Sequence, residues 1–109
     1  MATVLLADDD ALVRRVITEA LETAGHRVLA AADEGEALAV REPYDVALVD
    51  AHLGRRLRSP LGDELRSRRP GIRLIVMSGL PDEGGYLFAD AVLAKPFSFD
   101  DLLVLVSGR

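Results

Sequence analysis

Five short, almost uninterrupted apolar runs constrain the fold of this 109-residue chain more than any other feature. Segments with helical periodicity or with turn residues separate each run from the next. Strands that are apolar on both faces are typical of parallel sheets covered by helices on both sides. The sequence therefore predicts an α/β fold with a doubly wound, five-stranded parallel sheet. Its strands are expected at Thr3–Ala7, Val28–Ala32, Val46–Val49, Ile72–Met77 and Ala91–Ala94.

Helical patterns fill most of the gaps between these runs. The clearest one follows Asp10, which is placed to cap a helix, and it stops before Gly25, a residue type that often ends helices. The predicted helices are Leu12–Ala24, a weaker stretch around Ala37, a short helix over Leu61–Arg68, and a last helix from the N-cap Ser98 to about Val106.

Length and composition indicate one domain, residues 1–109, in which half of the residues are hydrophobic and 28% are charged. The chain has no cysteine, which excludes disulfides and thiolate metal sites and is compatible with a cytoplasmic location. A net charge of −5 argues against direct nucleic-acid binding. No apolar run is long enough to span a membrane, and since the first strand is predicted to begin at Thr3, we expect no signal peptide. The arginines cluster locally, and we interpret them as a solvated helix face and loop: Arg55, Arg56, Arg58, Arg66, Arg68 and Arg69.

Polar side chains follow four of the five predicted strands. Asp8 and Asp9 follow the first strand, Asp50 the third, Ser78 the fourth and Lys95 the fifth. Each has an ordinary explanation when taken alone, as a helix cap, a turn residue or a surface lysine. In an open parallel sheet, however, ligands bind at the carboxyl ends of the strands, so we expect these groups to meet at one edge.

The chemistry of these groups suggests phosphoryl transfer. Carboxylates crowded together repel one another, and binding a cation relieves the repulsion. Oxygen ligands without nearby cysteine or paired histidines suit Mg²⁺. A carboxylate beside such a metal can act as the nucleophile and form an aspartyl phosphate. Lys95 would then neutralise charge on the phosphoryl oxygens, and the Ser78 hydroxyl would donate a hydrogen bond to one of them.

Four sequence motifs together resemble the receiver domain of bacterial two-component response regulators, in its single-domain form. The likeness covers nearly the whole chain, and it is the order and spacing of the motifs that make it specific. They are Val4-Leu5-Leu6-Ala7-Asp8-Asp9-Asp10, Val46-Ala47-Leu48-Val49-Asp50, Val76-Met77-Ser78-Gly79 and Lys95-Pro96-Phe97.

The resemblance implies a flavodoxin-like fold with strand order 2-1-3-4-5 and a phosphorylation-dependent signalling switch. Asp50 would accept a phosphoryl group from a histidine kinase or a histidine phosphotransfer protein. Ser78 would be the switch hydroxyl, Lys95 would bind the phosphoryl group, and the Lys95-Pro96 bond would be cis. Such a protein is not an enzyme beyond self-catalysed phosphotransfer and slow autodephosphorylation. It would signal to an unknown downstream protein, as a monomer or weak homodimer.

The resemblance also implies the ligands of Mg²⁺. They would be Asp9, Asp50 and the backbone carbonyl of His52, with Asp8 acting largely through water. A side-chain ligand role for His52 is disfavoured, because an imidazole ligand would need nitrogen partners that the sequence does not offer nearby.

Three departures from the family pattern concern the readout rather than the chemistry. Gly54 stands where the family usually has proline, and the third helix is expected to begin late, near Leu61. The connection between the fourth and fifth strands is shorter than usual, so a fourth helix should be a single turn or missing. Val92 replaces the usual aromatic residue of the switch. We hypothesise that the loop Ala51–Pro60 moves instead.

Three other functions compete with the switch. A degenerate receiver that binds proteins without being phosphorylated is the main alternative. A phosphatase acting through Asp50 would need a second acid at the position of His52 and a cap domain. A nucleotide- or flavin-binding domain would need a glycine-rich loop after the first strand, where aspartates stand instead.

Overall fold

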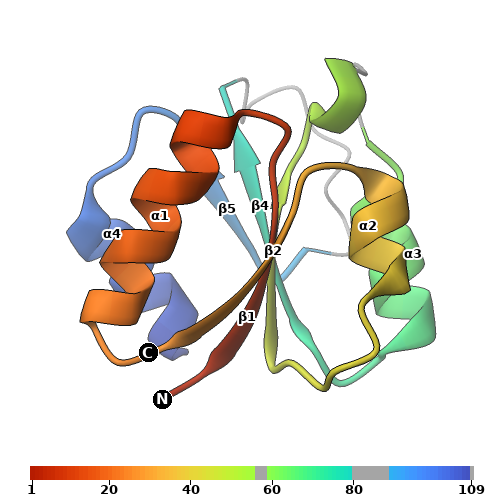
Figure 1. Ribbon diagram of the computed structural model, residues 1–109, viewed down its shortest axis with the longest axis horizontal. Coiled ribbons are helices and arrows are strands. Elements are labelled where there is room, and N and C mark those ends of the chain that lie inside the picture. The colour runs from red at the N-terminus through yellow and green to blue at the C-terminus, as the bar shows by residue number, and fades with distance from the viewer. Residues whose placement is uncertain (56–58, 80–88, 109) are drawn as a thin grey trace.

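The protein forms one five-stranded parallel sheet in a computed structural model that describes residues 1–55, 59–79 and 89–108 (Figure 1). The strand order is β2-β1-β3-β4-β5, with all neighbours parallel, which confirms the predicted fold class. Each strand begins and ends within one residue of its predicted bounds. The strands are β1 Thr3–Ala7, β2 Arg27–Ala31, β3 Val46–Asp50, β4 Arg73–Ser78 and β5 Ala91–Ala94.

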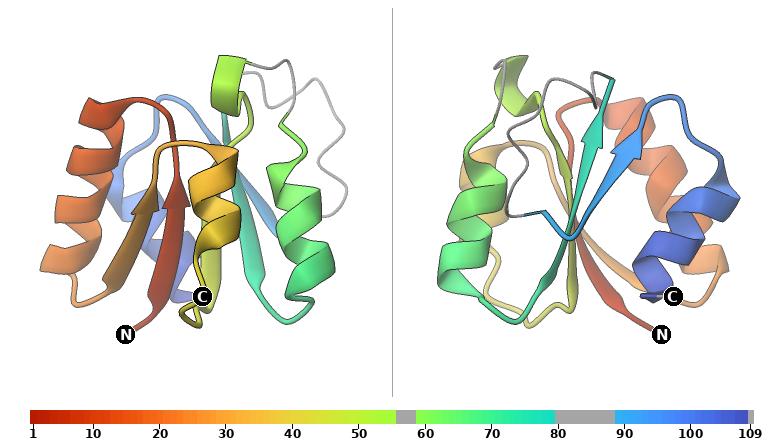
Figure 2. Two further views of the ribbon diagram at one scale, coloured as in Figure 1. Left: turned by 45° about the vertical axis from the view of Figure 1, so that its right-hand side comes forward. Right: turned by 180° about the vertical axis from the view of Figure 1, so that it is seen from behind.

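Helices cover both faces of the sheet. Helices α1 and α4 pack on one face and α2 and α3 on the other (Figure 2). Each face has its own apolar cluster, one centred on Leu6 and Leu48 and the other on Leu5 and Leu74. The helices are α1 Ala11–Thr23, α2 Glu34–Ala39, α3 Leu61–Arg68 and α4 Phe99–Ser107, with a 3-10 turn over Leu53–Arg55. None of the helices in the described ranges is long and apolar enough to cross a lipid bilayer.

Helix boundaries follow the local signals in the sequence. Ser98 caps α4 by accepting a hydrogen bond from the backbone N–H of Asp101, and α3 begins late, directly after Pro60, as predicted. The prediction that the helix between β4 and β5 is a single turn or missing concerns residues 80–88, which lie outside the described residues. The same holds for residues 56–58 of the arginine-rich loop.

One expectation about the strands is wrong at the sheet edges. Strands β1, β3 and β4 are buried almost throughout, but β2 and β5 are partly exposed, and Val92 on β5 is 38% exposed. The apolar runs alone did not distinguish the two classes of strand. An edge strand has a neighbour on one side only, so the helices shield it less completely than they shield the central strands.

The strand register brings the predicted site residues to one edge. The register pairs Ala7 with Val49, Asp50 with Met77, and Ser78 with Ala94. Asp8 therefore leaves β1 level with Asp50 at the end of β3. Lys95 leaves β5 one step beyond the residue paired with Ser78.

Candidate phosphoryl-transfer site

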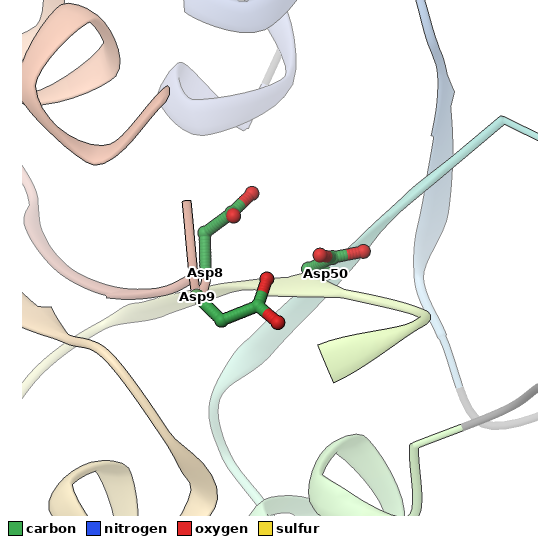
Figure 3. A group of neighbouring side chains, drawn as sticks. All are labelled: Asp8, Asp9 and Asp50. Atoms are coloured by element: carbon green, nitrogen blue, oxygen red, sulfur yellow. The ribbon is translucent and has the colours of Figure 1, made fainter. Parts of the chain in front are cut away.

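Three carboxylates lie together where β1 and β3 end. Asp8 and Asp9 follow β1, and Asp50 is the last residue of β3 (Figure 3). One carboxylate oxygen from each lies within 4.8 Å of the other two. Asp8 is 1% exposed and Asp50 6% exposed, whereas Asp9 is exposed to solvent. The site thus has two carboxylates that the fold shields from water and one at its mouth.

The acidic loop is tied to the start of α1. The Asp8 carboxylate accepts a hydrogen bond from the backbone N–H of Asp10 at 2.9 Å. Asp10 in turn caps α1, because its carboxylate accepts hydrogen bonds from the N–H groups of Leu12 and Val13 at 2.9 and 3.2 Å. This confirms Asp10 as the helix cap. The orientation of Asp8 therefore depends on the chain turning directly from strand into helix.

Asp50 is oriented by the turn that follows it. Its Oδ1 atom accepts a hydrogen bond from the backbone N–H of His52 at 3.0 Å. The next residue, Ala51, donates its N–H to the carbonyl of Met77 on the neighbouring strand, at 2.9 Å. The start of the loop after β3 is therefore anchored to the sheet, and it holds the carboxylate in place at the strand end.

Lys95 supplies the cation of the site. Its Nζ atom lies 3.7 Å from Oδ2 of Asp8 and 3.7 Å from Oδ1 of Asp50, and its side chain is 34% exposed. The Lys95-Pro96 bond is cis, in agreement with the expectation from the family resemblance. The Lys95 N–H donates a hydrogen bond to the carbonyl of Ser78 at 2.8 Å. This bond joins the backbones of the two residues that are predicted to contact the phosphoryl group.

Charge is only partly balanced within this group. Burial of the side chain raises the pKa of the Asp8 carboxyl, and the nearby carboxylates of Asp50 and Asp9 raise it further. The N–H of Asp10 and the ammonium of Lys95 lower this pKa without reversing the shift. Lys95 thus lies beside two of the three acids, Asp8 and Asp50, and its single charge does not offset the negative charge of the group.

The site fits a divalent cation bound through oxygen. The Oδ2 atom of Asp8 is buried and accepts no hydrogen bond from any described residue. The 3.7 Å between this atom and Nζ of Lys95 is too long for a hydrogen bond. Three carboxylates with an available oxygen suit a hard cation such as Mg²⁺.

Two further predicted residues border this group. Ser78 is fully buried at the end of β4, one residue beyond the partner of Asp50 in the register. His52 is half-buried in the turn after β3 and contributes a backbone N–H to Asp50. The roles expected for the Ser78 hydroxyl and the His52 carbonyl remain predictions.

Arg14 is a site-associated residue that the sequence analysis missed. Its guanidinium donates a hydrogen bond from Nη1 to the backbone carbonyl of Asp8 at 2.8 Å. A sequence signal for it exists, because a basic residue near the N-terminus of a helix opposes the helix macrodipole and needs a local reason.

Comparison with known proteins identifies the family of this fold and site. The family model described as "Response regulator receiver domain" matches residues 4–107. The receiver domain of the Francisella response regulator 1452 has a similar structure, with a TM-score of 0.85 and 30% identity over 98% of this chain and 94% of that one.

Two curated relatives show the same likeness in sequence. The Transcriptional regulatory protein PdtaR of Mycobacterium tuberculosis is 33% identical over 107 residues, which cover 92% of this chain and 52% of PdtaR. The Sensor histidine kinase AruS of Pseudomonas aeruginosa is 36% identical over 110 residues, which cover 91% of this chain and 11% of AruS. The chain therefore spans about half of one relative and a small part of the other. On the family match and these identities, the chain belongs to the response regulator receiver domain family, a family of signalling proteins.

Proposed function

We propose that this receiver domain is a switch in which Asp50 accepts a phosphoryl group in a Mg²⁺-dependent reaction. The observation that carries the proposal is the pairing of two buried carboxylates, Asp8 and Asp50, with a single lysine 3.7 Å from each. Among the three acids, Asp50 is the one that lies within a strand, at the end of β3. Asp8 shares the lysine but lies in the loop after β1.

The roles of the surrounding groups follow from their charges. Asp9 and Asp50, with the carbonyl of His52, would hold Mg²⁺, and Asp8 would contribute largely through water. Bound Mg²⁺ supplies positive charge that neutralises the oxygens of the transferring phosphoryl group. Lys95 offers a second positive charge, and Ser78 a hydroxyl that can donate to a phosphoryl oxygen.

In the proposed transfer, a carboxylate oxygen of Asp50 forms a bond to phosphorus. The bond between phosphorus and the donor nitrogen breaks, and the electron pair returns to the imidazole of the donor histidine. Hydrolysis later returns inorganic phosphate and the free carboxylate, which makes the switch reversible. Self-catalysed phosphotransfer and slow autodephosphorylation are the only reactions we assign to this protein.

The proposed phosphodonor is the phosphohistidine of a histidine kinase or of a histidine phosphotransfer protein. The match to a sensor histidine kinase and to a transcriptional regulator supports a place in two-component signalling. The net charge of −5 disfavours direct contact between this domain and nucleic acid, so the phosphorylated form should act on another protein. We propose a cytoplasmic location and a monomeric or weakly dimeric state.

Intact-mass analysis after incubation with acetyl phosphate tests the proposal. We expect a gain of one phosphoryl group that requires Mg²⁺ and is absent from an Asp50→Asn variant. No gain in the wild-type protein, together with no Mg²⁺ binding by calorimetry, would contradict the switch and favour a receiver fold kept for protein binding alone.

A further inference from the structure

We propose that Arg14 is a positioning residue for the acidic site, where it fixes the peptide between Asp8 and Asp9 so that Asp9 faces Asp50. This inference rests on the proposed Mg²⁺-dependent function and deepens it. Arg14 forms no ion pair with any carboxylate in residues 1–55, 59–79 and 89–108, and the observation that carries the inference is its 2.8 Å hydrogen bond to the Asp8 carbonyl.

The location of Arg14 on α1 explains how it reaches the loop. Side chains on an α-helix point back toward its N-terminus, and Arg14 is the fourth residue of α1. Its own N–H donates to the carbonyl of Asp10 at 3.0 Å, and its Nη1 donates to the carbonyl of Asp8. One residue thus holds two carbonyls of the acidic loop, through its backbone and through its side chain.

The electrostatics of the helix argue that this contact is not there to stabilise α1. The N-terminus of a helix carries a partial positive charge, which disfavours a cation in the first turns. The first turn of α1 also contains no acidic side chain that would pair with Arg14. The carbonyl of Asp8 is therefore the partner that accounts for a half-buried guanidinium at this position.

Holding the Asp8 carbonyl controls the direction of the next side chain. A peptide unit is planar, so the carbonyl of Asp8 and the N–H of Asp9 turn together. Asp8 is also held by its N–H, which donates to Ala31 at 3.2 Å, and by its carboxylate, which accepts from the loop. Asp9 is exposed at the site mouth, beside Asp8 and facing Asp50 (Figure 3). Its approach to the other acids depends on the peptide plane that Arg14 fixes.

The direction in which Mg²⁺ affinity changes when Arg14 is removed distinguishes a positioning role from a purely electrostatic one. If Arg14 acted only as a nearby cation, removing it would reduce repulsion and Mg²⁺ would bind more tightly. If Arg14 positions Asp9, removing it loosens one ligand and Mg²⁺ binds more weakly. Residues that orient metal ligands through hydrogen bonds typically contribute tenfold or more to affinity, so we expect a loss of about tenfold in Arg14→Ala.

Arg15→Ala provides a matched control for charge. Arg15 is the next residue of α1, is largely exposed, and pairs with Glu19 at 3.3 Å rather than with the acidic loop. We expect its Mg²⁺ dissociation constant to equal that of the wild type or to be slightly lower. Arg14→Lys keeps the charge but loses the guanidinium, and it should weaken binding less than alanine does.

The experiment is a calorimetric Mg²⁺ titration of the wild type and the three variants, with ¹⁵N–¹H spectra of each protein free of metal. The inference predicts weaker binding and a shifted Asp9 amide signal in Arg14→Ala but not in Arg15→Ala. Binding by Arg14→Ala that matches or exceeds the wild type overturns the inference and leaves the proposed function standing. If Arg14→Ala does not fold, the Mg²⁺ affinity of Arg14→Lys is compared with that of the wild type instead. Weaker binding supports the inference, and equal or tighter binding overturns it. Absence of Mg²⁺ binding in the wild type overturns the proposed function and this inference together.

Discussion

Replacing Asp8 with asparagine should make the metal-free protein more stable while weakening its response to Mg²⁺. The asparagine would keep the shape of the side chain and an oxygen that can accept from the N–H of Asp10. It would remove a negative charge that is 1% exposed and that lies beside two other carboxylates. Lys95 would still have Asp50 at 3.7 Å, so the lysine would not lose its last partner.

The size of the effect follows from the distances. At an effective dielectric constant of about 20, charges 4.8 Å apart repel by about 3.5 kcal/mol, and opposite charges 3.7 Å apart attract by about 4.5 kcal/mol. Asp8 has two such repulsions and one such attraction, and burial adds a further cost. Solvent weakens the interactions with the exposed Asp9 and the partly exposed Lys95. We therefore expect the free energy of unfolding to rise by about 1–3 kcal/mol in Asp8→Asn.

The assay is urea denaturation at neutral pH in the presence of a chelator, repeated with saturating Mg²⁺. Mg²⁺ at about a hundred times its wild-type dissociation constant should stabilise the wild type by about 2.7 kcal/mol and Asp8→Asn by less, because the variant keeps the direct ligands but has one negative charge fewer. Asp10→Asn is the matched control, because it removes an exposed carboxylate from the same loop and asparagine also caps helices well. Its stability should change by less than about 1 kcal/mol.

The pH dependence gives the same prediction a second check. Burial raises the pKa of Asp8 in the folded protein above the 3.8 expected for the unfolded chain. At pH values between the unfolded and the folded pKa, the folded protein therefore binds more protons than the unfolded chain. The stability cost of the charged Asp8 is therefore fully present above the folded pKa and disappears as the pH falls below 3.8. The advantage of Asp8→Asn should vanish over the same interval. A metal-free variant that is less stable than the wild type at neutral pH would refute this reasoning.

Three smaller predictions test other parts of the structure. Lys95→Met should slow labelling by acetyl phosphate by about a hundredfold, measured by intact mass, because it removes the cation facing the phosphoryl group; an unchanged rate would exclude that role. Asp90 accepts from the N–H of Leu74 and pairs with Arg66, which together hold its pKa below 3.8. Asp90→Asn should therefore lose up to about 1 kcal/mol at neutral pH in urea denaturation, and the loss should shrink as the pH falls through the folded pKa; a loss that persists in acid would contradict the ionic origin. The Cβ of Gly62→Ala would lie 3.3 Å from the side chain of Leu74, which borders a small cavity of about 20 Å³ and can shift into it. The better helix propensity of alanine should then raise thermal stability by up to about 1 kcal/mol, and a lower melting temperature would show that the cavity does not relieve the contact.

Much of the fold could be predicted because burial leaves a direct mark on sequence. Strands β1, β3 and β4 are shielded on both faces and are correspondingly apolar, so their bounds were predicted to within a residue. Helix ends marked by Asp10, Pro60 and Ser98 were also found, since caps and proline act locally. The exposure of β2 and β5 was not predicted, because it depends on which strands lie at the sheet edges.

The candidate site likewise has residues that the sequence predicted and a contact that it did not. The grouping of Asp8, Asp9 and Asp50 followed from their places at strand ends, and the structure brings them together with Lys95. The position of Arg14 near a helix N-terminus is a local signal, but its partner could not be identified from the sequence, because the contact depends on where a long side chain ends after the helix has formed. Its acceptor is a backbone carbonyl, which leaves no mark on residue type.

Locating the phosphoryl group on the chain tests the central claim most directly. After labelling with acetyl phosphate and Mg²⁺, reduction with borohydride converts an aspartyl phosphate to homoserine, and peptide mass spectrometry then identifies the modified residue. The account predicts homoserine at position 50 and at no other position, and none when Mg²⁺ is chelated. Homoserine at position 8 or 9, or a labelled protein without any homoserine, would contradict the assignment of Asp50 as the phosphoacceptor.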